Sequence, residues 1–338
     1  MADVSVAILG MNRIGTSLGL ALKRYNGRGE AHTFTVHGYD QSQNTLKTVQ
    51  EMKAVDETVN RLENIVREQD IVVITMPYNE LSTVYEIIAP NLRKGAVVID
   101  MTPVKQQSLK LANEHLREGT HLVSAEPIIN PKYLFDGTDE TQRATADYFD
   151  DSTILVMPSV KAIKEAVTLA TDLVTIIGAE PMFFDPAEFD PLMAATRALP
   201  TTIGTAYYYM LSNTDGWDDS QRLTGADFGM MTRYLFDTHP DDLRNLWLDS
   251  SEDLVRNLDG FINVLRQLRE AIADKDQDTI EAMLDAAARD YETWINRRYQ
   301  NRWQFSEQMN NSEAPTFGTM MGNLMGGFMS RRKDKDDS

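Results

Sequence analysis

Two glycines near the N-terminus, Gly10 and Gly15, have the type and spacing of residues that cradle a phosphate. They enclose the turn Gly10-Met-Asn-Arg-Ile-Gly15, which follows the apolar run Val4–Leu9 and precedes a helix-like stretch. In the dinucleotide-binding pattern Gly-x-Gly-x-x-Gly, the first glycine makes a tight turn and the last lets helix and strand pack closely. Asn12 takes the middle position, where asparagine tolerates left-handed backbone angles.

This turn predicts a site for a pyrophosphate group. Helix N-terminal amides would face the phosphates, because the helix dipole favours negative charge at that end. Arg13 is expected to add a cationic contact. The predicted contact residues are Gly10, Asn12, Arg13, Ile14 and Gly15. An ordinary turn between a strand and a helix is the alternative, and two further features favour the dinucleotide.

The second strand-like run and the third both end in residues that suit a dinucleotide. Asp40 follows the run Thr33–Gly38, where a carboxylate accepts from a ribose 2′-hydroxyl and repels a 2′-phosphate. NAD is therefore favoured as cofactor, with NADP possible. Met76 and Pro77 follow the run Ile71–Thr75, at the carboxyl edge where such sheets bind ligands.

Apolar runs alternate with helix-like stretches from Val4 to about Gly178. The runs are Val4–Leu9, Thr33–Gly38, Ile71–Thr75, Ala96–Ile99, His121–Ala125, Thr153–Met157 and a weaker candidate, Leu173–Ile177. The helix-like stretches are Ile14–Tyr25, Asn44–Met52, Leu62–Glu68, Leu81–Leu92, Gln106–His115 and Lys161–Thr171. This alternation predicts a Rossmann-type, doubly wound parallel sheet.

The pattern changes after Asp185-Pro186, where long helical stretches replace the strand-like runs. These stretches are Pro186–Asn213, Asp241–Asp274 and Gln277–Gln308. We therefore predict an NAD(P)-binding Rossmann domain over residues 1–182 and a helical substrate and dimerisation domain over 183–309. The Met/Gly-rich, charged tail 310–338 is expected to be disordered, with docking as a short helix as the alternative.

The composition narrows the class of protein. The 338 residues carry a formal net charge of −18, so an acidic surface repels nucleic acid, and an anionic substrate needs basic residues in its cleft. The chain has no cysteine, which excludes disulfides and thiolate metal sites, and no metal is expected. No apolar run reaches ~20 residues. We expect a cytoplasmic protein without a membrane partner.

An ordered set of segments resembles the prephenate/arogenate dehydrogenase family over nearly all of residues 4–300. The segments are the Gly10–Gly15 turn with Ser17-Leu-Gly-Leu-Ala-Leu, Asp70-Ile-Val-Val-Ile-Thr-Met-Pro, Leu92 to Lys105, Ala125-Glu-Pro127, Ile177-Gly-Ala-Glu, Asp185-Pro-Ala-Glu-Phe-Asp190 and Met231-Thr-Arg-Tyr234 with Asp237 and Pro240. The resemblance implies a Rossmann domain followed by a helical, 6-phosphogluconate-dehydrogenase-like domain that forms a homodimer.

The resemblance also implies a reaction and residues to perform it. A hydride passes from the ring carbon that bears a hydroxyl to the nicotinamide, and the ketone then loses carbon dioxide and aromatises. Arg233 falls at the family's substrate-carboxylate arginine, a role that suits its planar fork. Thr102 falls at a position where family members carry a hydroxyl residue that contacts the reacting end of the substrate. Lys105 is expected to bind substrate, with a solvent-facing lysine at a helix N-terminus as the alternative.

Three histidine positions of the family hold other residues here, namely Glu126, Arg197 and Thr201. One hypothesis makes Glu126 the catalytic base and lets Arg197 join Arg233 in holding a dicarboxylate. Arg197 could equally neutralise Glu126 in a plain ion pair. His121 lies near Glu126 in sequence, and it is either a base or, by preference, a core histidine.

The departures leave two alternative functions open. The protein could be an NAD-dependent dehydrogenase of another small hydroxy acid, or a non-catalytic NAD-binding homologue. The sequence favours oxidative decarboxylation of prephenate or arogenate over both.

Overall fold

The apolar runs of the first half form a single mixed sheet in the computed structural model, which describes residues 2–29, 32–136 and 139–301. Within these residues the strand order is β3-β2-β1-β4-β5-β6-β7-β8. The strands are β1 (Ala2–Leu9), β2 (His32–Tyr39), β3 (Glu57–Thr58), β4 (Ile71–Ile74), β5 (Val97–Asp100), β6 (His121–Ile128), β7 (Ser152–Pro158) and β8 (Ala179–Phe183). The central strands β4 and β5 are buried throughout, as their continuous Val/Ile runs predict.

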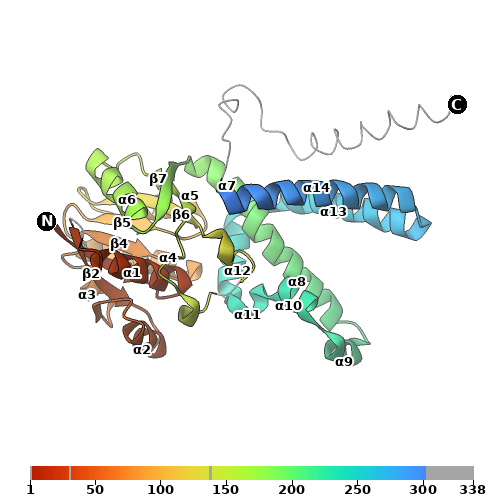
Figure 1. The fold of residues 1–338 in the computed structure, drawn as a ribbon, viewed down its shortest axis with the longest axis horizontal. Coiled ribbons are helices and arrows are strands. Elements are labelled where there is room, and N and C mark those ends of the chain that lie inside the picture. Colours follow the sequence, from red (N-terminus) through yellow and green to blue (C-terminus); the bar gives the residue numbers. More distant parts are fainter. Residues whose placement is uncertain (1, 30–31, 137–138, 302–338) are drawn as a thin grey trace, which may run out of the picture. The chain divides into compact units, whose positions relative to one another are not determined.

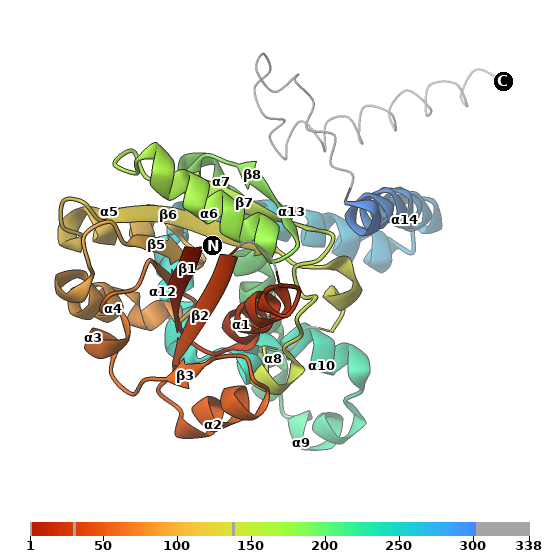
Figure 2. The ribbon, with the colours of Figure 1, turned by 60° about the vertical axis from the view of Figure 1, so that its left-hand side comes forward.

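Helices cover both faces of this sheet (Figure 1). They are α1 (Arg13–Asn26), α2 (Gln43–Glu51), α3 (Leu62–Ile65), α4 (Leu81–Ile88), α5 (Lys105–His115) and α6 (Lys164–Ile176). Figure 2 shows α1 on one side of β1 and β2 and α4 on the other. The Rossmann-type fold is therefore confirmed, and it sets the carboxyl ends of β1, β4, β5 and β6 along one edge.

Two details of the predicted sheet are wrong. Strand β7 runs antiparallel to β6, because the described residues of the connection between them form only short 3-10 turns and no crossover helix. The weaker strand candidate Leu173–Ile177 lies in α6 and its C-cap, and the strand that follows is β8. Its apolar residues face the sheet from the helix, a pattern that periodicity cannot separate from a short buried strand.

The second half is helical, as predicted. The helices are α7 (Pro186–Met193), a π-helical turn (Ala194–Ala198), α8 (Leu199–Ser212), α9 (Trp217–Ser220), α10 (Ala226–Thr232), α11 (Tyr234–Asp237), α12 (Pro240–Asp249), α13 (Ser251–Asp274) and α14 (Gln277–Gln300). The predicted helix Asp241–Asp274 is interrupted at Ser250. In the described part of the chain no helix combines the length and apolarity needed to cross a bilayer. The cytoplasmic location stays a prediction.

The described chain separates into two compact units, with the division between Asn257 and Leu258 inside α13. The first unit holds the whole sheet and the helices up to α12. The second holds the rest of α13 and all of α14. Asp276 is the N-cap of α14, and its side chain accepts from the N–H of Thr279. The predicted boundary at residues 182–183 stays a prediction, and the tail 310–338 lies outside the described residues.

Candidate active site

The turn after β1 requires both of its glycines for packing. Gly10 has a φ of +97°, and a Cβ there would lie 2.7 Å from the backbone nitrogen of Met76. A Cβ on Gly15 would lie 2.1 Å from the carbonyl oxygen of Gly10. The Thr75 hydroxyl also donates to the Gly10 oxygen at 2.6 Å. The turn is therefore fixed against the end of β4.

Asn12 performs a different task from the one its left-handed tolerance suggested. Its backbone is extended, with φ −68° and ψ −172°, so that expectation is wrong. Its side chain accepts from the N–H of Gly15 at 3.0 Å and donates to the carbonyl of Thr75 at 3.0 Å. Asn12 is the N-cap of α1, and it also bridges the turn to β4.

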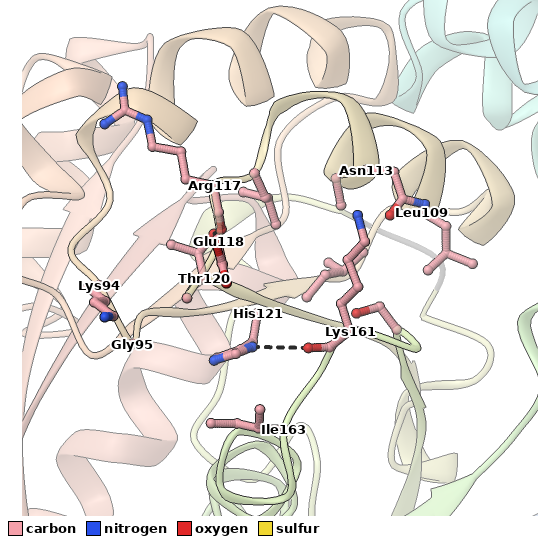
Figure 3. Close-up of a pocket in the computed structure, with 15 residues that line it drawn as sticks. Lys94, Gly95, Leu109, Asn113, Arg117, Glu118, Thr120, His121, Lys161 and Ile163 are labelled. Atoms are coloured by element: carbon pink, nitrogen blue, oxygen red, sulfur yellow. Dashed lines mark hydrogen bonds between the residues drawn. The ribbon is translucent and has the colours of Figure 1, made fainter.

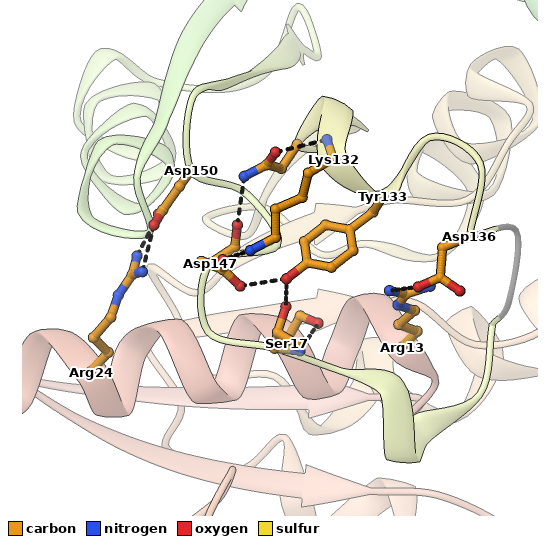
Figure 4. A network of polar contacts seen from close by, with 10 residues as sticks. Arg13, Ser17, Arg24, Lys132, Tyr133, Asp136, Asp147 and Asp150 are labelled. Carbon is orange, nitrogen blue, oxygen red and sulfur yellow. Dashed lines mark hydrogen bonds and ion pairs between the residues drawn. The ribbon is translucent and has the colours of Figure 1, made fainter. Parts of the chain in front are cut away.

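Arg13 points toward the segment that follows β6 (Figure 4). The side chain is buried, forms an ion pair with Asp136 at 2.8 Å and lies over the rings of Tyr133 and Tyr148 at 5.0 and 4.8 Å. These cation–π and ionic contacts attach that segment to α1. The phosphate contact predicted for Arg13 stays a prediction.

Two groups beside the turn fit a dinucleotide. The backbone N–H of Ile14 has no partner among the described protein atoms, which leaves a helix N-terminal donor for a phosphate. The Asp40 carboxylate accepts from the N–H groups of Met11 at 2.9 Å and Ser42 at 2.8 Å, which hold it at the end of β2. A carboxylate has about four acceptor positions, so capacity for ribose hydroxyls remains. Met76 is buried at the end of β4, and Pro77 is exposed.

A second polar cluster lies around Glu126 on β6. Its Oε2 accepts from the Lys105 Nζ at 3.1 Å, and Lys105 is 0% exposed. The same ammonium donates to the carbonyls of Thr102 and Ala125 and lies 5.2 Å from the Phe189 ring centre. The solvent-facing alternative for Lys105 is therefore wrong. Its three N–H donors all meet protein acceptors, so the lysine orients Glu126 from inside the protein.

Thr102 lies beside this cluster with its hydroxyl directed inward. The hydroxyl donates to Asp100 Oδ1 at 2.6 Å and lies 3.2 Å from the Ser108 hydroxyl. Asp100 is fully buried and also accepts from the Tyr85 hydroxyl at 2.9 Å. The structure thus places Thr102 near Glu126 and Lys105, in a buried network that shapes the turn between β5 and α5.

Arg197 approaches Glu126 from the helical region. Its Nη1 lies 4.0 Å from Glu126 Oε1, and its side chain is 49% exposed. Arg197 belongs to the π-helical turn between α7 and α8. Pro200 follows this turn and cannot donate to a carbonyl four residues earlier, which favours a wider turn at this point. Thr201, another position where the resemblance implies a histidine, is buried and accepts from the Trp247 indole N–H at 3.0 Å.

Asp139 is a member of the site that sequence reasoning missed. The residue keeps exposed surface, yet protein atoms surround its carboxyl closely enough to raise its pKa to about 6. Nearby Arg197 opposes this rise, and nearby Asp237 adds to it. In sequence Asp139 is one acid in the polar stretch Asp136–Glu140, so no pattern distinguished it from a solvated loop residue.

Arg233 lies at the junction of α10 and α11. Its Nε donates to Asp237 Oδ2 at 2.5 Å, and its side chain is 34% exposed. The charges of Asp237 and Arg197 both influence the pKa of Asp139. Arg197 and Arg233, which pairs with Asp237, therefore border one charged region. The structure therefore brings Glu126, Lys105 and Arg197 into contact and places Arg233 on the side of Asp237.

His121 is separate from this cluster. It begins β6, five residues before Glu126, which corresponds to about 17 Å along a strand. Its ring is buried, with Nδ1 lying 3.4 Å from the Lys161 carbonyl. This placement supports the core-histidine interpretation.

Comparison with known proteins identifies the family of a chain with this fold and site. Residues 18–182 match the nucleotide-binding domain of prephenate dehydrogenase, and residues 185–286 match the dimerization domain of the same family. The chain belongs to the prephenate dehydrogenase family.

Individual relatives agree with this membership. The cyclohexadienyl dehydrogenase of Zymomonas mobilis is 25% identical over 280 residues, which cover 81% of this chain and 90% of that protein. The prephenate dehydrogenase of A. aeolicus, solved with hydroxyphenyl propionate and NAD+, has a TM-score of 0.71 and 19% identity, covering 86% of this chain and 98% of its own. The arogenate dehydrogenase of Synechocystis has a TM-score of 0.62 at 19% identity, covering 86% of this chain and all of its own. At these identities the two structures show the fold.

Proposed function

We propose that this protein catalyses the NAD-dependent oxidative decarboxylation of prephenate or arogenate in tyrosine biosynthesis. The observation that carries the proposal is the Glu126 carboxylate, held by buried Lys105 and approached by Arg197 at the carboxyl edge of a nucleotide-binding sheet. The cluster offers a proton acceptor beside cations, which a dicarboxylate substrate needs. When bound, NAD would accept the hydride from the substrate carbon.

Glu126 is proposed to handle the proton. It accepts the proton of the substrate hydroxyl as that carbon loses its hydride and becomes a ketone. The ring carboxylate then leaves as carbon dioxide, its bonding electrons aromatise the ring, and the ketone oxygen becomes a phenolic oxygen. That oxygen can take the proton back from Glu126, so the carboxylate is regenerated.

Three basic residues are proposed to divide two tasks. Lys105 holds Glu126 in position and has no donor left for substrate, which replaces its predicted role as a substrate ligand. Arg197 is half-exposed and only 4.0 Å from Glu126, so it can turn to a substrate carboxylate without exposing a buried charge. Arg233 can bind a second carboxylate through the N–H groups that Asp237 leaves unused.

The test is turnover, followed by the absorbance of reduced nicotinamide, with prephenate and arogenate and with NAD and NADP. Glu126→Gln should lower kcat about 10²- to 10⁴-fold, because it removes a general base. Arg233→Met should lower kcat/KM roughly 10- to 150-fold, the loss of a charged hydrogen bond worth about 1.5–3 kcal/mol. The control Arg222→Met removes an exposed arginine that has no ion pair among the described residues, and it should match wild type. No turnover with either substrate would reject the proposal.

We further propose that two copies form a homodimer through α13 and α14. Exposed apolar residues follow a spacing of seven, three and seven on α13, at Val255, Ile262, Leu265 and Ile272. On α14 the exposed residues Leu284, Tyr291 and Trp294 repeat the seven-and-three spacing. Such spacing places the side chains on one stripe of each helix, the pattern of a helix–helix contact. The match to a dimerization domain over residues 185–286 supports this assembly.

A further inference from the structure

A cavity lies at the opposite edge of the sheet from Glu126 (Figure 3). It has a volume of about 990 Å³ and is bounded by the starts of β5 and β6, the end of α5 and the loop between β7 and α6. It contains none of the residues assigned above to the reaction. The lining includes His121, whose Nδ1 lies 3.4 Å from the Lys161 carbonyl.

The charge around this cavity is opposite to that of the molecule. The chain has a net charge of −18, yet the lining contains Lys94, Arg117 and Lys161 against a single acid, Glu118. Within the described residues, none of the three basic side chains forms an ion pair or a side-chain hydrogen bond. Many basic residues elsewhere in the chain are neutralised, as in the Lys23–Asp56 and Arg24–Asp150 pairs. The three basic residues are exposed and outnumber Glu118, so the lining carries a net positive charge that no ion pair among the described residues neutralises.

The rest of the lining is mainly apolar. Its apolar members are Leu109, Ala112, Leu116, Leu122 and Ile163, and its neutral polar members include Asn113, Thr120 and Ser159. A cavity with apolar walls and a few convergent polar groups is the usual form of a small-molecule site. An inorganic ion would leave the apolar walls of the cavity exposed to water. A neutral apolar molecule would leave the basic side chains without a counter-charge.

We propose that this cavity binds a small organic anion, with a carboxylate or phosphate group near Lys161 and an apolar body against Leu109 and Leu116. Lys94, on the other side of the cavity in Figure 3, adds to its positive potential. The cavity and the Glu126 cluster share two elements. Helix α5 begins at Lys105 and ends in the cavity wall, and β6 begins in the wall and ends beyond Glu126. The site is independent of the proposed reaction, and so is its test.

The probe is 8-anilinonaphthalene-1-sulfonate, an aromatic anion whose fluorescence reports binding, titrated into the full chain with saturating NAD. Its uncharged analogue, N-phenyl-1-naphthylamine, is titrated in parallel. The double variant Lys94→Glu with Lys161→Glu should weaken binding of the anion at least about tenfold and change the neutral dye less than about twofold. Leu109→Trp fills the cavity without changing its charge, and it should weaken both dyes. Lys110→Glu, an exposed residue of α5 outside the lining, is the matched control and should change neither.

Competition with benzoate and with phenyl phosphate separates the two headgroups, because the better competitor of the sulfonate identifies the preferred one. The proposal is overturned if the double variant binds the anionic dye as wild type does, or if Lys110→Glu weakens it equally. Failure of both competitors to displace the dye also overturns it. Turnover of prephenate or arogenate plays no part in these outcomes.

Discussion

At the scale of single residues, the proposed site depends on the Glu126 carboxylate, at a position where the family resemblance implies a histidine. A histidine at position 126 would hold one proton on its ring, whereas Glu126 is acceptor-only when ionised and needs a cation to stay in place inside the protein. Lys105 supplies that cation from a fully buried position. The glutamate and the lysine are therefore best understood as one unit.

Replacing Lys105 with methionine should destabilise the protein strongly. The change leaves the Glu126 carboxylate without its buried partner, and breaking such a pair costs about 3–5 kcal/mol. Thermal or urea unfolding measures the loss. Lys110→Met, on the exposed side of the same helix, should stay within about 0.5 kcal/mol of wild type. Adding Glu126→Gln to Lys105→Met should restore part of the stability, and an equal loss in the double variant would argue against the pairing.

Asp139 should give the enzyme a pH dependence centred near 6. Its pKa is raised from 3.8 to about 6, so the carboxyl is neutral below pH 6 and ionised above it, where it competes for Arg197. The KM for a dicarboxylate should therefore rise as the pH increases from 5 to 7. The free energy of unfolding depends on the same group. The contribution of Asp139 to stability is fully present below about pH 4 and is lost as the pH rises through 6.

Asp139→Asn provides the check on this dependence. The amide does not ionise, so its KM profile should be flat over the same range, measured by initial rates at each pH. A wild-type profile that is already flat, or a variant profile that keeps its slope, would assign the dependence to another group.

The roles predicted for the site residues stay predictions, and the structure adds their contacts. Glu126 and Arg197 were selected through the family resemblance, and the structure places their charged groups 4.0 Å apart. The burial of Lys105 could not be predicted, because a lysine at a helix start is ordinarily solvated and only the fold shows that Phe189 and β6 cover it. Asp139 gave no signal, because its environment depends on contacts with residues far away in the chain.

At the scale of elements, Asn12 joins α1, the turn and β4. Asn12→Ala removes both side-chain hydrogen bonds and should destabilise the protein by about 0.5–2 kcal/mol, the usual cost of losing a helix N-cap. Asn12→Gly should cost only a few tenths of a kcal/mol for the cap itself, because glycine is a tolerated N-cap residue. Denaturant unfolding distinguishes the two, and equal losses would show that the bridge to Thr75 dominates.

The order of strands and helices was largely predictable from the sequence. The direction of β7 and the π-helical turn before α8 were not predicted. Continuous Val/Ile runs identified β4 and β5, since parallel strands covered on both faces have this composition. The reversal of β7 depends on the connection after Ile128, whose described residues form no crossover helix before Ser152, and the sequence shows no helical pattern there. The π-helical turn at Ala194–Ala198 was not predicted, because its apolar pattern resembles that of an α-helix and Pro200 alone does not distinguish a π-helical turn from a kink.

At the scale of the whole molecule, the exposed apolar stripe on α13 should govern assembly. Ile262→Lys with Leu265→Lys places two charges in the proposed dimer contact and should give monomers in sedimentation experiments at micromolar concentration. Gln267→Lys adds a charge to the opposite side of the same helix, so it should leave the dimer intact. A wild-type chain that sediments as a monomer would contradict the assembly.

The two amide hydrogen bonds of Asp40 have a consequence for redesign of the enzyme. A protein engineer who wishes to exchange NAD for NADP would first remove this acid, because it repels a 2′-phosphate. In this chain the same carboxylate is also the acceptor for the N–H groups of Met11 and Ser42, in the turns after β1 and β2. In its predicted role, this one side chain would set the cofactor preference and also hold the two turns together. A successful exchange must supply a substitute acceptor together with the new cation.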